Sequence, residues 1–442
     1  MHVFAHGIVG RADLPIPEEL FAAAAAGVLV VSFAALAALW STPRLERWPE
    51  RRLVALPVAA DVLPGAIGVA AFCLCVYAGL AGTQEERDNL APAAVYTAFW
   101  VGIPFASLLL GDIWRVLSPW RALGRGVGWS AARLAGGGLP APLPYPERLG
   151  RFPAAAGVIA FGICELCWAA AKEPAPLAVL MLVYLVSMLV GMSLYGVEAW
   201  TRNADAFGVL FSCFARLAPL ARSHGALVLR PPLVGATRLE RVPGTAAVLL
   251  AGIGVTAFDG AAEGPLFNGL VPSLQAGFGA FGFGLGTALE LGLVVGLIGV
   301  VALVAGIWAL GIGGMPGRPG AELAHALIPI LAAYVVAHYF SLLAYNGQEL
   351  WPLLSDPLGD PADRFGRAGA EIDYGVVSAT AIWYVQVGAL VVGHVAALVL
   401  AHDRALVLYG SHRAATGSQL VMLVLMVCFT CLGLWLLSEA NG

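Results

Sequence analysis

Ten long apolar runs divide this sequence, and they set the limits on how it can fold. Each run has about the 20 residues that an α-helix needs to cross the hydrocarbon core of a bilayer. Hydrophobic residues make up 60% of the chain and charged residues only 12%, whereas soluble domains carry roughly 25% charged residues. This excludes a soluble globular enzyme, a disordered chain and a secreted disulfide scaffold. A porin-like barrel is also excluded, because its strands would alternate apolar and polar residues over about 10 positions.

The apolar runs predict an all-α fold, a polytopic transmembrane helix bundle of about 10 spans. We expect residues 1–442 to form a single integral membrane domain whose main partner is the lipid bilayer. The predicted spans are residues 20–40, 63–82, 93–114, 153–171, 176–196, 245–262, 285–314, 321–346, 379–402 and 420–438.

The basic residues predict which side of the membrane each loop faces. With the N-terminus outside, the cytoplasmic loops hold 19 of the 24 Lys and Arg residues, in agreement with the excess of positive charge that membrane proteins keep inside. Both termini, the segment 1–19 and the acidic loop 347–378 are therefore predicted to be exterior. Because the basic residues are nearly all Arg and because Ala and Gly are abundant, we expect a bacterial plasma membrane. The predicted cytoplasmic loops are 41–62, 115–152, 197–244, 315–320 and 403–419.

Two stretches beside these loops combine large apolar residues with Arg, namely 112–125 and 205–223. Amphipathic segments of this kind can lie flat at the boundary between headgroups and acyl chains. Trp114 and Trp120 are then expected to anchor the first stretch at the interface. An ordinary amphipathic connector is the alternative.

Four ionisable residues within or at the ends of spans form the main candidate site. They are Glu165, Asp259, Glu290 and His338. A helical rise of 1.5 Å per residue places all four in the outer half of the bilayer. A His with carboxylates can bind a divalent metal such as Zn or Cu, or it can relay protons. The alternative is that each residue only forms a hydrogen bond across the bundle.

Secondary candidates are His325, His394 and His402, with Cys164 and Cys167, on the eighth, ninth and fourth predicted spans. His338 and His394 differ in depth by about 10 Å, which argues against their binding one haem axially. His325 and His402 lie at comparable depth and could bind a haem only near the interface, so haem is the weaker alternative. Cys164 and Cys167 form a C-x-x-C pair on one helix face, which suits a soft metal. Cys is also a common packing residue in apolar surroundings.

Five segments resemble a family of bacterial, mainly actinobacterial, polytopic membrane proteins. Some members of that family carry the label fenitrothion hydrolase, an organophosphate-ester hydrolase. The resemblance implies a multi-pass membrane fold and a hydrolase activity, but it implies no catalytic residues. The segments are AHGIVGRADLPIP, LLGDIWRVLSPWRAL, VTAFDG, HALIPILAAYVVAHYFSLL and GHVAALVLAHDRAL.

The first functional hypothesis is a transport or binding protein that handles a small solute, a metal ion or a proton at the outer-half site. The second is a membrane-embedded metallohydrolase of apolar esters, in which a metal activates water and a carboxylate acts as the base. The third is a non-catalytic assembly subunit. The sequence has no H-E-x-x-H, G-x-S-x-G or Walker motif, and without a dense basic stripe or an aromatic platform it gives no support for nucleic-acid binding.

Overall fold

Helices account for 76% of the computed structural model, in agreement with an all-α bundle. The structure describes residues 18–136, 140–223, 225–262, 264–359 and 371–440. Most of the predicted exterior segment 1–19 and the middle of the predicted loop 347–378 lie outside the described residues.

Seven helices in the described ranges are long and apolar enough to cross a membrane. Three shorter apolar helices fall on the three remaining predicted spans. A helical bundle of membrane-spanning character is therefore confirmed, while the number of spans and the exterior position of both termini stay predictions. The long helices contain α2 (Val62–Ala81), η4 with α4 (Ala93–Gly102 and Ile103–Leu110), α8 (Pro174–Tyr195), α14 (Leu285–Gly313), α16 (Leu327–Tyr345), α18 (Ala379–Tyr409) and α20 (Leu420–Ala440), and the shorter ones are α7 (Phe152–Cys167), α12 (Thr245–Ala261) and part of α1 (Glu18–Leu39).

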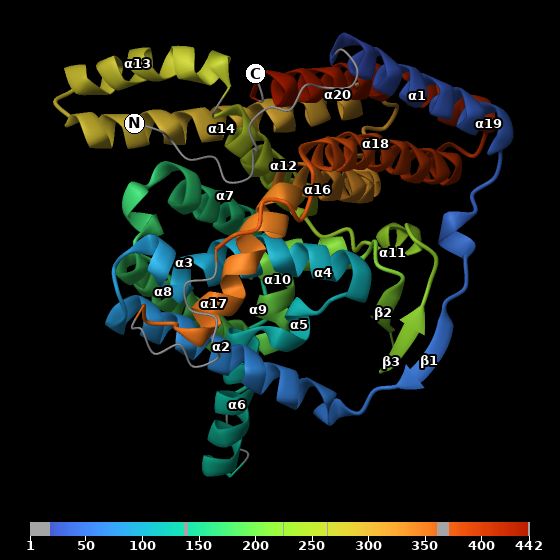
Figure 1. Ribbon diagram of the computed structural model, residues 1–442. Helices are drawn as coiled ribbons and strands as arrows, with labels where there is room; N and C mark the ends of the chain where they lie inside the picture. Colours follow the sequence, from blue (N-terminus) through green and yellow to red (C-terminus); the bar gives the residue numbers. More distant parts are fainter. Residues whose placement is uncertain (1–17, 137–139, 224, 263, 360–370, 441–442) are drawn as a thin grey trace.

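Short helices connect or flank these elements, and one of them, α13, runs beside α14 (Figure 1). They are α3 (Leu90–Pro92), α5 (Trp114–Leu117), α6 (Pro119–Leu134), α9 (Val197–Asn203), α10 (Ala206–Ala215), α11 (Val234–Thr237), α13 (Pro265–Ala280), α15 (Gly320–Leu323), α17 (Leu350–Ser355) and α19 (His412–Ser418).

Helix α12 lies at the centre of the packing. It contacts α7, α14 and α16, and most of its side chains are buried. Small residues allow this close approach: a Cβ on Gly254 would lie only 2.8 Å from the Val301 Cα of α14. The glycines of this helix therefore act in helix packing.

The first described helix packs against the last, because α1 contacts α20 as well as α18 (Figure 1). Asp403 of α18 fixes the turn that follows α1. Its carboxylate accepts hydrogen bonds from the Trp40 Nε1 at 2.9 Å and from the backbone N–H groups of Arg44 at 2.7 Å and Leu45 at 3.2 Å. Asp403 is 1% exposed, so these three donors replace the hydrogen bonds that water would give to an exposed carboxylate.

A small antiparallel sheet joins two of the loops that the sequence predicts to be cytoplasmic. Its strand order is β1-β3-β2, and Leu229 of β3 lies opposite both Arg51 of β1 and Leu220 of β2. The sequence analysis contains no strand, because these segments are short and lack a clear alternation of apolar and polar residues. The strands are β1 (Arg51–Ala55), β2 (Leu220–Ser223) and β3 (Ala226–Leu229).

The interpretation of Trp114 and Trp120 as interface anchors is wrong. Both side chains are buried, and their rings lie 5.2 Å apart in edge contact. Phe211 of α10 packs against Trp114 and Phe207 against Trp120. Helix α10 itself is buried against α4 and α7, so the apolar face of this segment contacts protein.

We predict that replacing Asp403 with Ala lowers the free energy of unfolding by at least ~2 kcal/mol, because buried donors lose their acceptor. Unfolding of the purified protein in mild detergent measures the change. Asp88→Ala, at an exposed position, is the control and is expected to change it by less than ~0.5 kcal/mol. Equal stability of the two variants would show that the Asp403 contacts contribute nothing.

Candidate functional site

Two of the four predicted site residues are in direct contact. The His338 Nε2 lies 2.9 Å from the Asp259 Oδ2, and the two side chains are 8% and 6% exposed. Because a carboxylate oxygen only accepts, the imidazole Nε2–H is the donor. The Tyr339 hydroxyl donates to the same oxygen at 2.8 Å.

Helices α12 and α16 position this pair. Asp259 is 14 residues beyond Thr245, the first residue of α12, which places it about 21 Å along the helix axis. His338 lies within α16, which packs against α12. Gly260 faces the imidazole, since a Cβ there would be 3.6 Å from the His338 Cε1 and Nδ1. No side chain from position 260 therefore covers the Nδ1 edge of the ring.

Glu165 of α7 belongs to the same polar region without touching the pair. It is 3% exposed, it interacts electrostatically with Asp259, and its Oε2 has no hydrogen-bond partner among the described residues. Tyr96 of η4 also interacts electrostatically with Glu165, while its hydroxyl donates to the Ala171 carbonyl at 2.7 Å. The region thus holds a second buried carboxylate.

Glu290 is not part of this arrangement. Its Oε1 accepts a hydrogen bond at 3.2 Å from the backbone N–H of Ala169, in the short segment that follows α7. Within the ranges that the structure describes, no three His, Cys, Asp or Glu side chains lie close enough to hold a metal ion. The donor set therefore does not fit the Zn or Cu site that depth alone had suggested for Glu165, Asp259, Glu290 and His338.

His402 forms hydrogen bonds that link neighbouring helices. Its Nε2 donates to the Trp40 carbonyl at 3.0 Å, and the Gln419 Nε2 lies 3.2 Å from its Nδ1. Because a carbonyl only accepts, Nδ1 is the acceptor from Gln419. Both ring nitrogens thus connect α18 to the end of α1 and to the start of α20.

His394 and His325 are buried in different surroundings. The His394 Nδ1 donates to the Leu390 carbonyl at 2.7 Å, and its ring lines an apolar cavity of about 90 Å³. His325 lines a small polar gap beside Arg404. In both residues the Nε2 has no hydrogen-bond partner among the described residues.

Cys164 and Cys167 are free thiols on α7, the first half-buried and the second buried. They lie on either side of Glu165 in the sequence, and Cys167 packs in the main apolar core. No third thiol, imidazole or carboxylate in the described part of the chain joins them as a metal ligand.

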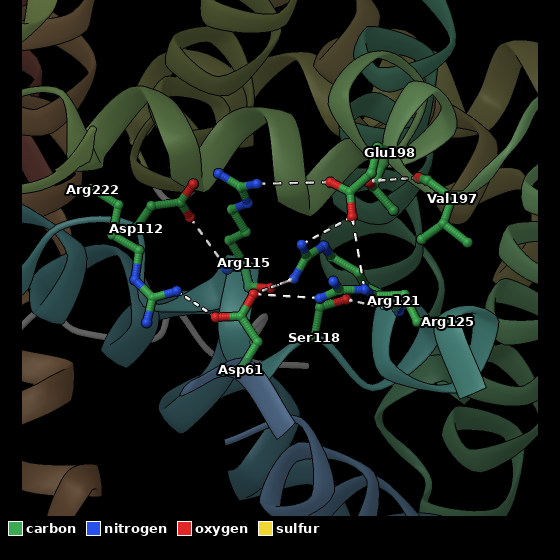
Figure 2. Close-up of polar contacts among 10 residues, drawn as sticks. Asp61, Asp112, Arg115, Ser118, Arg121, Arg125, Val197, Glu198 and Arg222 are labelled. Carbon is green, nitrogen blue, oxygen red and sulfur yellow. Dashed lines mark hydrogen bonds and ion pairs between the residues drawn. The ribbon is translucent and has the colours of Figure 1, made fainter. Parts of the chain in front are cut away.

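Figure 2 shows a second polar cluster, which was not predicted from the sequence. Asp61, beside the start of α2, lies 3.4 Å from Arg121 and from Arg125 and also pairs with Arg222. Glu198 of α9 accepts a hydrogen bond from Arg121 at 2.9 Å. We call these five residues the arginine cluster. In the sequence, these arginines served only to predict which side of the membrane the loops face. The acidic residues in the same loops were the signal that could have predicted ion pairs with them.

The contact of Asp259 with His338 and Tyr339 joins a carboxylate, an imidazole and a phenol inside an apolar bundle. Such a group can hold a proton and pass it on. No protein-family model, curated protein or solved structure matches the chain. Its function therefore has to be inferred from these contacts.

We predict that Tyr339→Phe lowers the free energy of unfolding by about 0.5–1.5 kcal/mol, the net value of one hydrogen bond, because Asp259 keeps His338 as a donor. Unfolding in mild detergent measures the change. Tyr384→Phe removes the hydroxyl of an exposed tyrosine and is expected to have no effect. If both variants were as stable as the wild type, Tyr339 would not contribute to holding Asp259.

Proposed function

We propose that this chain is a multi-pass membrane protein that passes protons, alone or together with a small solute, through the site around Asp259 and His338. The hydrogen bond between these two buried side chains is the observation that carries the proposal. Ionisable residues are rare inside membrane helices because they are costly there, and they mark proton and ion pathways.

The pair can accept a proton without creating net charge in the apolar interior. A proton binds the His338 Nδ1, on the edge that faces Gly260. The ring then becomes an imidazolium beside the Asp259 carboxylate, and the two opposite charges compensate each other. The Nε2 proton can next transfer to the Asp259 Oδ2, 2.9 Å away, which leaves a neutral imidazole and a neutral carboxyl group.

Glu165 is a second proton acceptor in the proposed pathway. Its carboxylate interacts electrostatically with Asp259 and lies in the same buried region. Two neighbouring carboxylates are buried most cheaply when one of them holds a proton. A proton that leaves Asp259 therefore has a nearby acceptor on α7.

Metal-ion handling has less support, because the described residues do not bring three ligands together. Hydrolysis of an apolar ester is implied by the family resemblance alone, and no contact in the structure favours it over proton handling. The third hypothesis, a non-catalytic assembly subunit, gives the buried pair of Asp259 and His338 no function.

We predict that Asp259→Asn and His338→Gln each slow proton flux at least tenfold. The protein is reconstituted into liposomes that contain a pH-sensitive dye, and a membrane potential drives the flux. Asparagine cannot exchange a proton at this position, and glutamine cannot carry a positive charge. Glu290→Gln makes the same carboxylate-to-amide change outside the pair and is expected to keep the wild-type rate.

Wild-type flux in Asp259→Asn would contradict the proposal, and so would a wild-type protein that passes no more protons than empty liposomes. A chelator is expected to leave the flux unchanged. Loss of flux on chelation would instead favour the metal-ion version of the hypothesis.

A further inference from the structure

A polar cavity of about 340 Å³ lies beside the arginine cluster, between the end of α4, α5, α9, α10 and the β2–β3 hairpin. Seven arginines and four carboxylates line it, an excess of three positive charges. Its volume falls within the ~300–1,000 Å³ of small-molecule sites. The side chains of Arg115 and Glu198 on its wall are 51% and 53% exposed, so solvent reaches it.

Charges behind the wall do not cancel this excess. Asp61 and Glu50 contact lining arginines, but each also pairs with an arginine that lies outside the lining. These outer arginines are Arg125 and Arg238. The wider region therefore keeps the same positive balance as the cavity wall.

Two of the four lining carboxylates form no ion pair with an arginine in the described part of the chain. Asp205 accepts hydrogen bonds from the Trp120 Nε1 at 2.7 Å and the Tyr184 hydroxyl at 2.8 Å. Asp112 accepts one from the backbone N–H of Arg115 at 3.2 Å.

Two lining guanidinium groups keep an N–H that no acceptor in the described part of the chain uses. The Arg151 Nε and the Arg121 Nε are buried without a hydrogen-bond partner among the described residues, and the two residues are 4% and 5% exposed. The Arg216 guanidinium donates to the backbone carbonyls of Gly235 and Arg238, at 3.4 Å and 2.7 Å, and forms no ion pair among the described residues. Burial lowers the pKa of the Arg216 guanidinium, although an arginine keeps its proton. An anion in the cavity would stabilise this half-buried cation.

We propose that this cavity binds a phosphate-bearing anion with two or more negative charges. Paired guanidinium N–H groups match the oxygens of a phosphate group, and they bind a doubly charged oxyanion more strongly than a single carboxylate. The ligand is either free in the cytoplasm, which the loop charges predict to be on this side, or the headgroup of an anionic phospholipid. This site is separate from the proposed proton site and uses none of its residues.

Inorganic pyrophosphate is the probe, and its binding to the full chain is measured by calorimetry in nanodiscs of neutral phosphatidylcholine. We expect Arg202→Ala to weaken binding about tenfold, the loss of one charge-assisted hydrogen bond. Arg202 is an exposed lining residue, so its replacement leaves the fold intact. Arg115→Ala, also half-exposed on the wall, is a second variant with the same expected effect. Arg413→Ala, at an exposed position outside the cavity, is the matched control and is expected to bind as the wild type does.

Nanodiscs that contain cardiolipin, a phospholipid with two phosphate groups, separate the two sources of the ligand. If the site takes a lipid headgroup, this lipid competes with pyrophosphate and weakens its binding. The wild-type protein then also retains more of the anionic lipid after delipidation than Arg202→Ala does. If the ligand is free in the cytoplasm, pyrophosphate binds equally in both lipids. No binding by the wild type in phosphatidylcholine, or an equal loss in Arg202→Ala and Arg413→Ala, would overturn the proposal.

Discussion

A carboxylate buried between apolar helices is stabilised by hydrogen-bond donors that face it, and the fold of this chain supplies such donors at Asp259. His338 and Tyr339, neighbours on α16, both donate to one oxygen of this carboxylate. The two hydrogen bonds fix how α16 lies against α12, and α16 in turn packs against α18. A polar requirement at one residue thus sets the positions of three helices.

The same two helices that carry Glu165 and Asp259 begin in the arginine-rich region. Arg151, beside the start of α7, donates to the Thr245 hydroxyl at the start of α12 at 3.1 Å. From this contact the helices run about 20 Å to their carboxylates. This contact therefore joins α7 and α12 at the ends from which both carboxylates are about equally far.

How much the sequence can predict follows from what each signal measures. The length of an apolar run finds a spanning helix, and all ten predicted spans fall on helices of the structure. Helical rise gives the depth of a residue, and it predicts the same half of the bilayer for Asp259 and His338, which the structure brings into contact. Depth does not give the direction of a side chain, so the same prediction included Glu290, although that side chain contacts the segment after α7.

Other features depend on contacts between residues far apart in the sequence, which a local sequence pattern does not predict. In the sequence, Tyr339 is one of several aromatic residues in an apolar run. Only the structure shows that its hydroxyl donates to Asp259. Trp114 and Trp120 have the composition of interface anchors, but the Phe residues of a helix 80 or more positions further along the chain cover them. The cavity arginines are drawn from loops far apart in sequence, so their convergence is a property of the tertiary fold alone.

The most direct test of the central claim is solid-state NMR of the protein in lipid bilayers with ¹⁵N-labelled histidine. The ring signals of His338, assigned by their loss in His338→Gln, are compared between the wild type and Asp259→Asn. The account predicts that the His338 signals shift in Asp259→Asn and change with pH in the wild type, while those of His402 stay in place. His338 signals that ignore both Asp259 and pH would contradict it.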